Sequence, residues 1–523
     1  MNREAMIESL RSQGSQPWDV IVIGGGATGA GVAVDAATRG YKTLLVERED
    51  FGKGTSSKST KLVHGGVRYL EQGNLSLVMG ALKERGILRR NAPHLVHELP
   101  FVVPNYSWWE APFYGIGMKI YDLLATKYSF GKSRILSREE TLEQIPNLRE
   151  DGLRGGVVYF DGQFDDARLL IHLIMTAADH GATVLNYASV TGFEFDESGF
   201  VDGITLADHE SCDVYSAKAH VIVNATGAFT DETRRLADKA AGTLLSPSQG
   251  IHLVLPREFL RSGSAIMVPH TSDGRVLFVI PWHDRTVIGT TDTPIESASY
   301  EPAPMEEEIA FVLETAAAYL TRPPRREDIL SIYVGIRPLV KAAGSDLSKT
   351  SALSRDHTIH IDPNGLLTIV GGKWTTYRQM AEDTVDHAAM LGHLPEVECR
   401  TASLAIHAAT EEAPADLKVY GTDATNIVAI SEASPELAEP LHPALPYRKA
   451  EVVWAVREEM ARTVEDVLAR RTRALLLDAA AAMDSGPIVA SLMAAEMQRD
   501  KLWELEQVRS FREMAKQYLP QLI

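Results

Sequence analysis

Near its N-terminus the chain reads Asp19-Val20-Ile21-Val22-Ile23-Gly24-Gly25-Gly26-Ala27-Thr28-Gly29. The β-branched residues before the glycines predict a short, buried parallel strand. The alanine-rich segment 30–39 predicts a helix that stops at Gly40, and 42–46 predicts a second strand that ends at Glu47. Strand, glycine-rich turn, helix and strand together predict a βαβ unit of the kind that binds dinucleotides.

The residues of this turn each suit a nucleotide site. Gly24 permits the tight turn, Gly26 lets the backbone approach a pyrophosphate, and Gly29 lets helix and strand pack closely. The N-terminus of the helix, where Thr28 lies, offers N–H groups to the phosphates. Glu47 can accept hydrogen bonds from a ribose. This fingerprint alone does not separate FAD from NAD.

Two later strand ends favour an extended cofactor, FAD. The strand 220–224 runs into Ala225-Thr226-Gly227-Ala228, where small residues permit a close approach of the backbone to a cofactor. A third strand, 366–370, ends at Gly371-Gly372-Lys373 and opens a helix near Thr375. That helix N-terminus could stabilise negative charge on a reduced flavin. We expect the three strand ends to meet at one edge of a sheet.

Composition narrows the class of protein. The 523 residues suggest several domains, and 52 Lys and Arg against 70 Asp and Glu give a net charge of −18. A nucleic-acid partner is therefore not expected. Cys212 and Cys399 form no CxxC motif, so a redox dithiol beside the flavin is not expected. No segment resembles a membrane span or a secretory signal, which predicts a cytoplasmic protein, with a place on a membrane surface left open.

One segment reverses the acidic balance. Residues 51–90 carry eight Lys and Arg against Glu71 and Glu84. The charges of 83–90 fit a solvated helix face. Arg68 is less easily explained in this way, because it lies in a short motif with His64, Gly65, Gly66 and Tyr69.

Here the sequence resembles the FAD-dependent glycerol-3-phosphate dehydrogenases of the bacterial aerobic and mitochondrial kind. The matching segments follow the family order across most of the chain: 23–31, 55–70, 165–169, 224–227, 279–282, 288–292, 335–339, 354–357 and 371–378. The resemblance implies an α/β fold with a glutathione-reductase-type FAD-binding Rossmann domain, an antiparallel-sheet substrate domain and an all-α C-terminal domain.

The expected division of the chain is discontinuous. The FAD-binding domain takes residues 1–80, 156–240 and 335–394, the substrate-binding cap takes 81–155 and 241–334, and the helical C-terminal domain takes 395–523. Within the last part, 457–473 and 503–517 predict amphipathic helices.

The resemblance also implies a reaction: oxidation of sn-glycerol 3-phosphate to dihydroxyacetone phosphate by hydride transfer to FAD, with electrons passed to a membrane quinone. An oxidase that passes the electrons to O2 is the alternative. A flavoenzyme acting on amines or other hydroxy acids, and a flavin-binding protein without turnover, are further alternatives. No metal is expected; His94, His97, His357 and His360 form no convincing set of ligands.

Arginine suits bidentate binding of a phosphate. By resemblance, the substrate-binding candidates are Arg68, Tyr69, Arg337, Arg355 and Lys373, and Arg337 is also a catalytic candidate. Arg337 could instead form a salt bridge at the edge of the core, and Asp356 beside Arg355 could simply pair with a neighbour.

Thr55, Ser56 and Ser57 resemble the segment that meets the flavin phosphates and ribityl chain. A plain polar loop is the other interpretation. The base that takes the hydroxyl proton is His64 or His252, because an imidazole has a suitable pKa near neutral pH. His252 lies in an apolar strand, where a histidine is often only structural.

An aromatic segment begins at Trp108-Trp109 and continues through 113–124, with Lys119 and Lys127 nearby. It predicts either a surface that contacts lipid and admits quinone, on the inner face of the cytoplasmic membrane, or a buried helix of the substrate domain. The sequence leaves a homodimer open.

Overall fold

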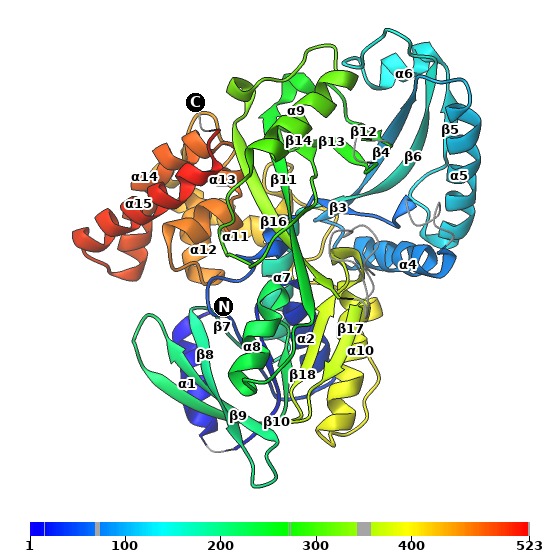
Figure 1. The fold of residues 1–523 in the computed structure, drawn as a ribbon. Coiled ribbons are helices and arrows are strands. Elements are labelled where there is room, and N and C mark those ends of the chain that lie inside the picture. The colour runs from blue at the N-terminus through cyan, green and yellow to red at the C-terminus, as the bar shows by residue number, and fades with distance from the viewer. Residues whose placement is uncertain (15, 68–73, 270, 272–273, 342–356, 521–523) are drawn as a thin grey trace.

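The computed structural model describes residues 1–523 apart from 15, 68–73, 270, 272–273, 342–356 and 521–523 (Figure 1). Its first sheet contains eight strands in the part of the chain so described: β1 (Trp18–Ile23), β2 (Thr43–Val46), β7 (Thr183–Leu185), β8 (Ala188–Phe195), β9 (Val201–Asp208), β10 (Val214–Asn224), β17 (His357–Ile361) and β18 (Leu367–Gly371). The strand order is β17-β18-β10-β1-β2-β7, and β9 pairs with β8 and β10.

Parallel pairing brings the predicted strand ends together. β1 lies between β10 and β2, and β10 pairs in parallel with β18. The carboxyl ends of β18, β10 and β1 therefore meet at one edge of the sheet, as the sequence predicts. Helices α2 (Ala27–Thr38), α7 (Asp166–Asp179) and α10 (Tyr377–Leu391) share one buried core with these strands. α1 (Arg3–Gln13) packs against β7, and α8 (Thr230–Ala237) packs against β8.

The second sheet occupies the upper half of Figure 1 and is mostly antiparallel. The described residues give it ten strands: β3 (Leu62–Val63), β4 (Val96–Asn105), β5 (Arg134–Leu136), β6 (Gly155–Phe164), β11 (Leu245–Pro256), β12 (Ala265–Val268), β13 (Leu277–Trp282), β14 (Arg285–Gly289), β15 (Thr293–Pro294) and β16 (Ser331–Val340). Its order is β15-β11-β14-β13-β12-β4-β6-β3, with β16 on β11 and β5 on β6. The accompanying helices are α4 (Leu75–Asn91), α5 (Glu110–Ala125), α6 (Arg138–Gln144) and α9 (Glu306–Tyr319).

Two strands run across the predicted domain boundaries. β6 pairs with β4 along its length, and β16 pairs with β11, so both belong to the second sheet. Residues 156–164 and 335–340 thus lie in that sheet, although the predicted division assigns them to the FAD-binding domain. The division as a whole stays a prediction.

The C-terminal part is helical, with α11 (Ala424–Ala433), α12 (Lys449–Glu458), α13 (Ala474–Leu477), α14 (Ala479–Met497) and α15 (Lys501–Ala515). The predicted helix at 503–517 corresponds to α15. The prediction of one amphipathic helix over 457–473 is wrong. α12 ends at Glu458, Met460 adopts a left-handed backbone with φ +53°, and a short π-helix follows at Asp466–Arg471. A left-handed residue cannot continue a right-handed helix.

Candidate active site

The turn between β1 and α2 leaves no room for side chains. Gly24 has φ +111°, and a Cβ there would lie 2.6 Å from the carbonyl oxygen of Ala225. A Cβ on Gly29 would lie 1.9 Å from the carbonyl oxygen of Gly24. Gly26 is the residue that precedes α2. Close packing of β1, α2 and the end of β10 therefore requires glycine, and it aims the α2 N-terminus along the sheet edge.

Glu47 fixes the other side of this turn. One carboxylate oxygen accepts the backbone N–H of Gly25 at 2.6 Å, and the other accepts the N–H of Glu49 at 2.8 Å. Burial raises the pKa of Glu47, while these two backbone donors act in the opposite direction. The remaining lone pairs of the carboxyl group can accept hydroxyl groups, as a ribose would need.

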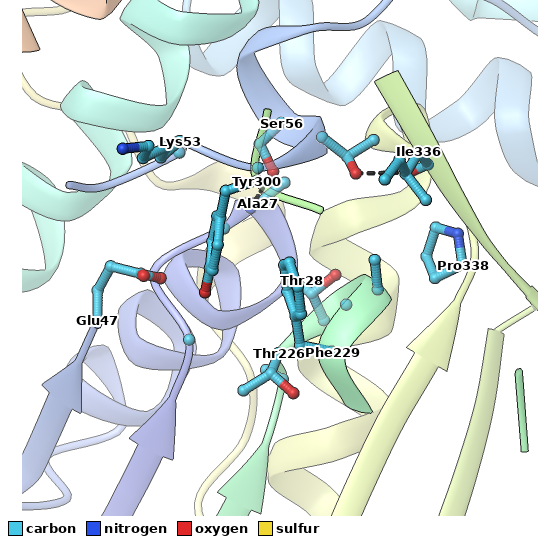
Figure 2. Close-up of a pocket in the computed structure, with 18 of the residues that line it drawn as sticks. Ala27, Thr28, Glu47, Lys53, Ser56, Thr226, Phe229, Tyr300, Ile336 and Pro338 are labelled. Atoms are coloured by element: carbon cyan, nitrogen blue, oxygen red, sulfur yellow. Dashed lines mark hydrogen bonds between the residues drawn. The ribbon is translucent and has the colours of Figure 1, made fainter. Parts of the chain in front are cut away.

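A cavity of about 420 Å³ follows the carboxyl edge of the first sheet (Figure 2). Its walls include most of the predicted cofactor residues, with Lys373 beside them: Gly24, Gly26, Thr28, Glu47, Thr55, Ser56, Thr226, Gly227, Gly371 and Gly372. Gly29, Ser57 and Thr375 lie behind the wall. The Ser57 hydroxyl donates to the carbonyl of Gly52 at 2.8 Å, and the Thr375 hydroxyl accepts the N–H of His64 at 3.2 Å.

The loop of Thr55 and Ser56 is bonded to three elements. Ser56 Oγ accepts the N–H of Ala27 at the start of α2, at 2.9 Å. Thr55 Oγ1 donates to the carbonyl of Ile336 in β16 at 2.5 Å. The indole of Trp374, just beyond β18, donates to the carbonyl of Ser56 at 2.8 Å. This loop therefore joins both sheets at the cavity.

Aromatic residues without a sequence signal also line the cavity. The rings of Phe229 and Tyr300 stack with centroids 4.2 Å apart (Figure 2). The guanidinium of Arg48 lies 5.6 Å from the centre of the Tyr300 ring. Phe229 follows β10, whereas Tyr300 lies in the loop after β15. Their proximity results from the packing of the two sheets, so no local motif could have indicated it.

The predicted cations differ in their surroundings. Lys373 lines the cavity at the end of β18. Arg337 lies in β16, where Nη1 is 3.2 Å from the carboxylate of Asp292 and Nη2 donates to the carbonyl of Thr291 at 2.9 Å. The salt bridge that the sequence left open therefore exists, and about a quarter of the Arg337 side chain is exposed. Arg68, Tyr69 and Arg355 lie outside the described residues.

The two candidate histidines are held differently. His252, in β11, is buried, stacks on Tyr333 with centroids 4.7 Å apart, and pairs through Nε2 with the Thr60 hydroxyl at 2.9 Å. Burial, then the charges of Lys61 and Arg337, hold the pKa of His252 well below its ordinary value. His64 follows β3 and is half-buried.

Comparison with known proteins identifies the family. Residues 19–378 match the model of the FAD-dependent oxidoreductases, and 366–502 match that of the C-terminal domain of alpha-glycerophosphate oxidase. The mitochondrial glycerol-3-phosphate dehydrogenase of Homo sapiens is 39% identical over 98% of this chain and 74% of its own length. The chain belongs to the FAD-dependent glycerol-3-phosphate dehydrogenase family.

Other family members are similar over comparable lengths. The mitochondrial enzyme SDP6 of Arabidopsis thaliana is 40% identical over 96% of this chain and 87% of its own length. The solved structure of glycerol-3-phosphate dehydrogenase from Bacillus halodurans, complexed with FAD, matches with a TM-score of 0.81 and 28% identity, over 99% of this chain and 98% of that one. These matches confirm the predicted family, fold class and cofactor.

The residues of this family member fit FAD. The cavity brings together a helix N-terminus for phosphates, a carboxylate at the end of β2 for a ribose, and the glycine-bearing ends of β10 and β18. Gly227 and Gly372 adopt φ of +56° and +71°, so the backbone at these strand ends takes left-handed turns that favour glycine. Bound FAD would supply the acceptor for a hydride.

Proposed function

We propose that the protein oxidises sn-glycerol 3-phosphate to dihydroxyacetone phosphate with FAD as hydride acceptor, and that the electrons pass on to a membrane quinone. The observation that carries the reaction is near-full-length similarity to glycerol-3-phosphate dehydrogenases, joined with a cationic Lys373 at the flavin cavity. A phosphorylated alcohol is a dianion, and its phosphate group needs such a cation as a hydrogen-bond donor.

Lys373 and Arg337 are our candidates for binding the phosphate, with Arg68, Tyr69 and Arg355 completing the predicted set. Of the two histidines we favour His64 as the proton acceptor. Burial, and then the charges of Lys61 and Arg337, oppose a positive charge on the His252 ring, and its Nε2 is already paired with Thr60. His252 then acts by holding Thr60, next to Lys61, in place.

Anaerobic mixing of the FAD-loaded protein with glycerol 3-phosphate tests the reaction. We expect the flavin absorbance near 450 nm to bleach within seconds, because enzymes typically turn over about once per second or faster. Glycerol and glycine serve as controls for the phosphate and for the amine alternative. A flavin that dithionite reduces but glycerol 3-phosphate does not would contradict the proposal, and bleaching by glycine alone would favour the amine alternative.

The quinone proposal is supported by one surface. Helix α5 and the residues before it expose a row of large apolar side chains: Trp108, Trp109, Phe113, Ile116, Ile120 and Leu123. Trp108 and Leu123 are 78% and 76% exposed. Apolar side chains on one helix with lysines beside it are typical of a helix that lies in the surface of a bilayer. This surface supports our proposal that the protein binds a membrane, with the inner face of the cytoplasmic membrane as the expected location.

None of the helices in the described ranges is long and apolar enough to cross a bilayer.

The yield of hydrogen peroxide distinguishes a quinone acceptor from O2. We expect turnover in air to release much less than one peroxide per glycerol 3-phosphate, and turnover to rise when a soluble quinone is added. One peroxide per turnover, unchanged by quinone, would favour the oxidase.

A further inference from the structure

The loop between β2 and β3 forms one wall of the flavin cavity. Lys53, Thr55 and Ser56 line the cavity, and the backbone N–H of Gly52 donates to the carbonyl of Gly25 in the fingerprint turn at 3.1 Å. The position of this loop therefore sets the position of the donors around the α2 N-terminus.

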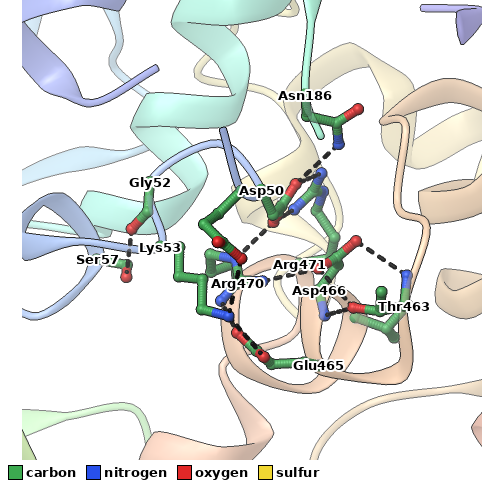
Figure 3. Close-up of polar contacts among 12 residues, drawn as sticks. Asp50, Gly52, Lys53, Ser57, Asn186, Thr463, Glu465, Asp466, Arg470 and Arg471 are labelled. Atoms are coloured by element: carbon green, nitrogen blue, oxygen red, sulfur yellow. Dashed lines mark hydrogen bonds and ion pairs between the residues drawn. The ribbon is translucent and has the colours of Figure 1, made fainter. Parts of the chain in front are cut away.

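Asp50 anchors the loop from behind, and it does not line the cavity. Its carboxylate is fully buried and pairs with two guanidinium groups from the C-terminal part (Figure 3). Arg471 reaches both of its oxygens, at 2.6 and 2.9 Å, and Arg470 binds one of them. Asn186 donates to Asp50 at 3.1 Å. Burial alone would raise the pKa of Asp50, but Arg471 and Arg470 lower it further than burial raises it.

A second contact reaches the cavity wall directly. The ammonium of Lys53 lies 3.1 Å from the carboxylate of Glu465 (Figure 3). It also lies 3.4 Å from the carboxylate of Glu49. Glu465 also accepts Arg470 at 2.8 Å. The segment 465–471 therefore holds the loop at Asp50 and at Lys53, through side chains that are all largely buried.

We propose that the C-terminal helical part is a positioning element for FAD: Arg470 and Arg471 fix Asp50 and so hold the cavity loop in its FAD-binding position. Bidentate guanidinium–carboxylate pairs in a buried setting fix geometry well, because a shift of either partner leaves a charge unpaired. Arg470, Arg471 and Asp50 act through the loop and need not touch the cofactor.

The proposal has a reciprocal consequence that needs no mutation. If the segment 463–473 favours FAD binding, FAD must stabilise that segment by the same factor. Hydrogen exchange of the full-length protein, without FAD and with saturating FAD, measures this. We expect slower exchange in peptides over 48–58 and also over 463–473, with no change over α11 in the same C-terminal part. Protection of 48–58 without protection of 463–473 would overturn the proposal.

A matched pair of variants supplies the second test. Asp50→Asn removes the charge that the two arginines bind. Asp179→Asn, at the end of α7, removes a carboxylate that also contacts the C-terminal part. Asp179 lies 2.5 Å from His407 and does not line the cavity. FAD fluorescence titrations of both apo-proteins give the dissociation constants.

We expect the dissociation constant to rise about tenfold or more for Asp50→Asn, equivalent to 1.4 kcal/mol, and less than twofold for Asp179→Asn. Equal affinities for Asp50→Asn and the unmodified protein, or equal losses in both variants, would overturn the proposal. If Asp50→Asn does not fold, the exchange experiment decides.

Discussion

Gly29 shows how strictly a single position can be determined. A Cβ at this position would lie only 1.9 Å from the carbonyl oxygen of Gly24, so the first turn of α2 can pack against β1 only because Gly29 has no side chain. For Gly29→Ala we expect α2 to be pushed from β1, at a cost of about 1–3 kcal/mol as in overpacked cores. We also expect the affinity for FAD to fall by at least tenfold. Thermal unfolding and flavin titration measure the two effects.

The same substitution at Gly80 is the control. Gly80 is exposed in α4 and has no neighbouring atom within 4 Å of its Cβ position. Alanine there should leave FAD binding unchanged and add up to about 1 kcal/mol of helix stability. Normal FAD affinity in Gly29→Ala would mean that the turn has more freedom than its geometry indicates.

Lys373 is the residue on which binding of the charged phosphate group of the substrate should depend. We expect Lys373→Met to retain FAD and to raise KM for glycerol 3-phosphate by about tenfold or more, since a charged hydrogen bond contributes about 1.5–3 kcal/mol. Lys501→Met, at an exposed lysine of α15, is the control. Steady-state kinetics with quinone measure both, and an unchanged KM in Lys373→Met would place the phosphate elsewhere.

Which residues the sequence could reveal depends on how local their constraint is. Gly24 and Gly29 are constrained by backbone atoms close to one turn, so the fingerprint alone predicts their geometry. Tyr300 and Phe229 meet only because two sheets pack together, and nothing near either residue indicates it. Arg470 lies in a segment that the sequence predicts to be an amphipathic helix, and no local pattern indicates its partner Asp50, which is 420 residues away in the chain.

The same distinction holds for whole elements. β1, β10 and β18 were predictable because each is an apolar run that stops at small residues, and parallel pairing then required their ends to meet. The course of the segment 457–473 was not predictable, because buried ion pairs between distant parts of the chain set it. Arg168 and Glu459 form one such pair, 2.6 Å apart.

Helix α12 should make stability depend on pH. Glu451, in its first turn, is buried and accepts the N–H of Arg448 and the hydroxyl of Tyr420. Burial raises its pKa from 4.5 to about 6, although both hydrogen bonds oppose the shift. The folded protein therefore binds this proton more tightly than the unfolded chain does. Its stabilisation is complete below pH 4.5 and is lost as the pH rises through 6.

The loss should be about 2 kcal/mol, at roughly 1.4 kcal/mol per pKa unit. Glu451→Gln cannot ionise and keeps an acceptor oxygen. Relative to the unmodified protein, this variant should therefore gain about 2 kcal/mol of unfolding free energy between pH 4.5 and pH 7.5. Denaturant unfolding at both pH values tests this, with Glu439→Gln at an exposed site as the control. A difference between variant and parent that does not change with pH would contradict the prediction.

The α5 surface predicts membrane binding that can be separated from catalysis. We expect Trp108/Trp109→Ser to lower co-sedimentation with anionic liposomes by about fivefold or more, because binding scales with the apolar area that enters the bilayer. Anaerobic flavin reduction by glycerol 3-phosphate should not change. Phe195/Phe200→Ser, at exposed apolar residues of the β8–β9 hairpin, is the matched control. Unchanged binding in the α5 variant would exclude this surface.

At the scale of the molecule, the cavity is a shared interface. Its walls come from the first sheet, from the loop of Tyr300 beyond β15, and from the loop that Arg470 and Arg471 hold. A ligand that binds only the folded arrangement adds about 2.7 kcal/mol at a hundred times its dissociation constant. Since both sheets contribute walls and the C-terminal part binds the loop that forms another, we expect FAD to raise the unfolding temperature of the whole chain by several degrees in calorimetry.

Riboflavin separates the contributions to this shift. It lacks the pyrophosphate and adenosine that the α2 N-terminus and Glu47 are placed to bind, so it should raise the unfolding temperature much less than FAD at equal concentration. If FAD moved only one of two resolved transitions, the sheets would unfold independently, and the cavity would not couple them. We expect a single transition that moves as a unit, because the loop of Asp50 contacts the fingerprint turn on one side and the C-terminal arginines on the other.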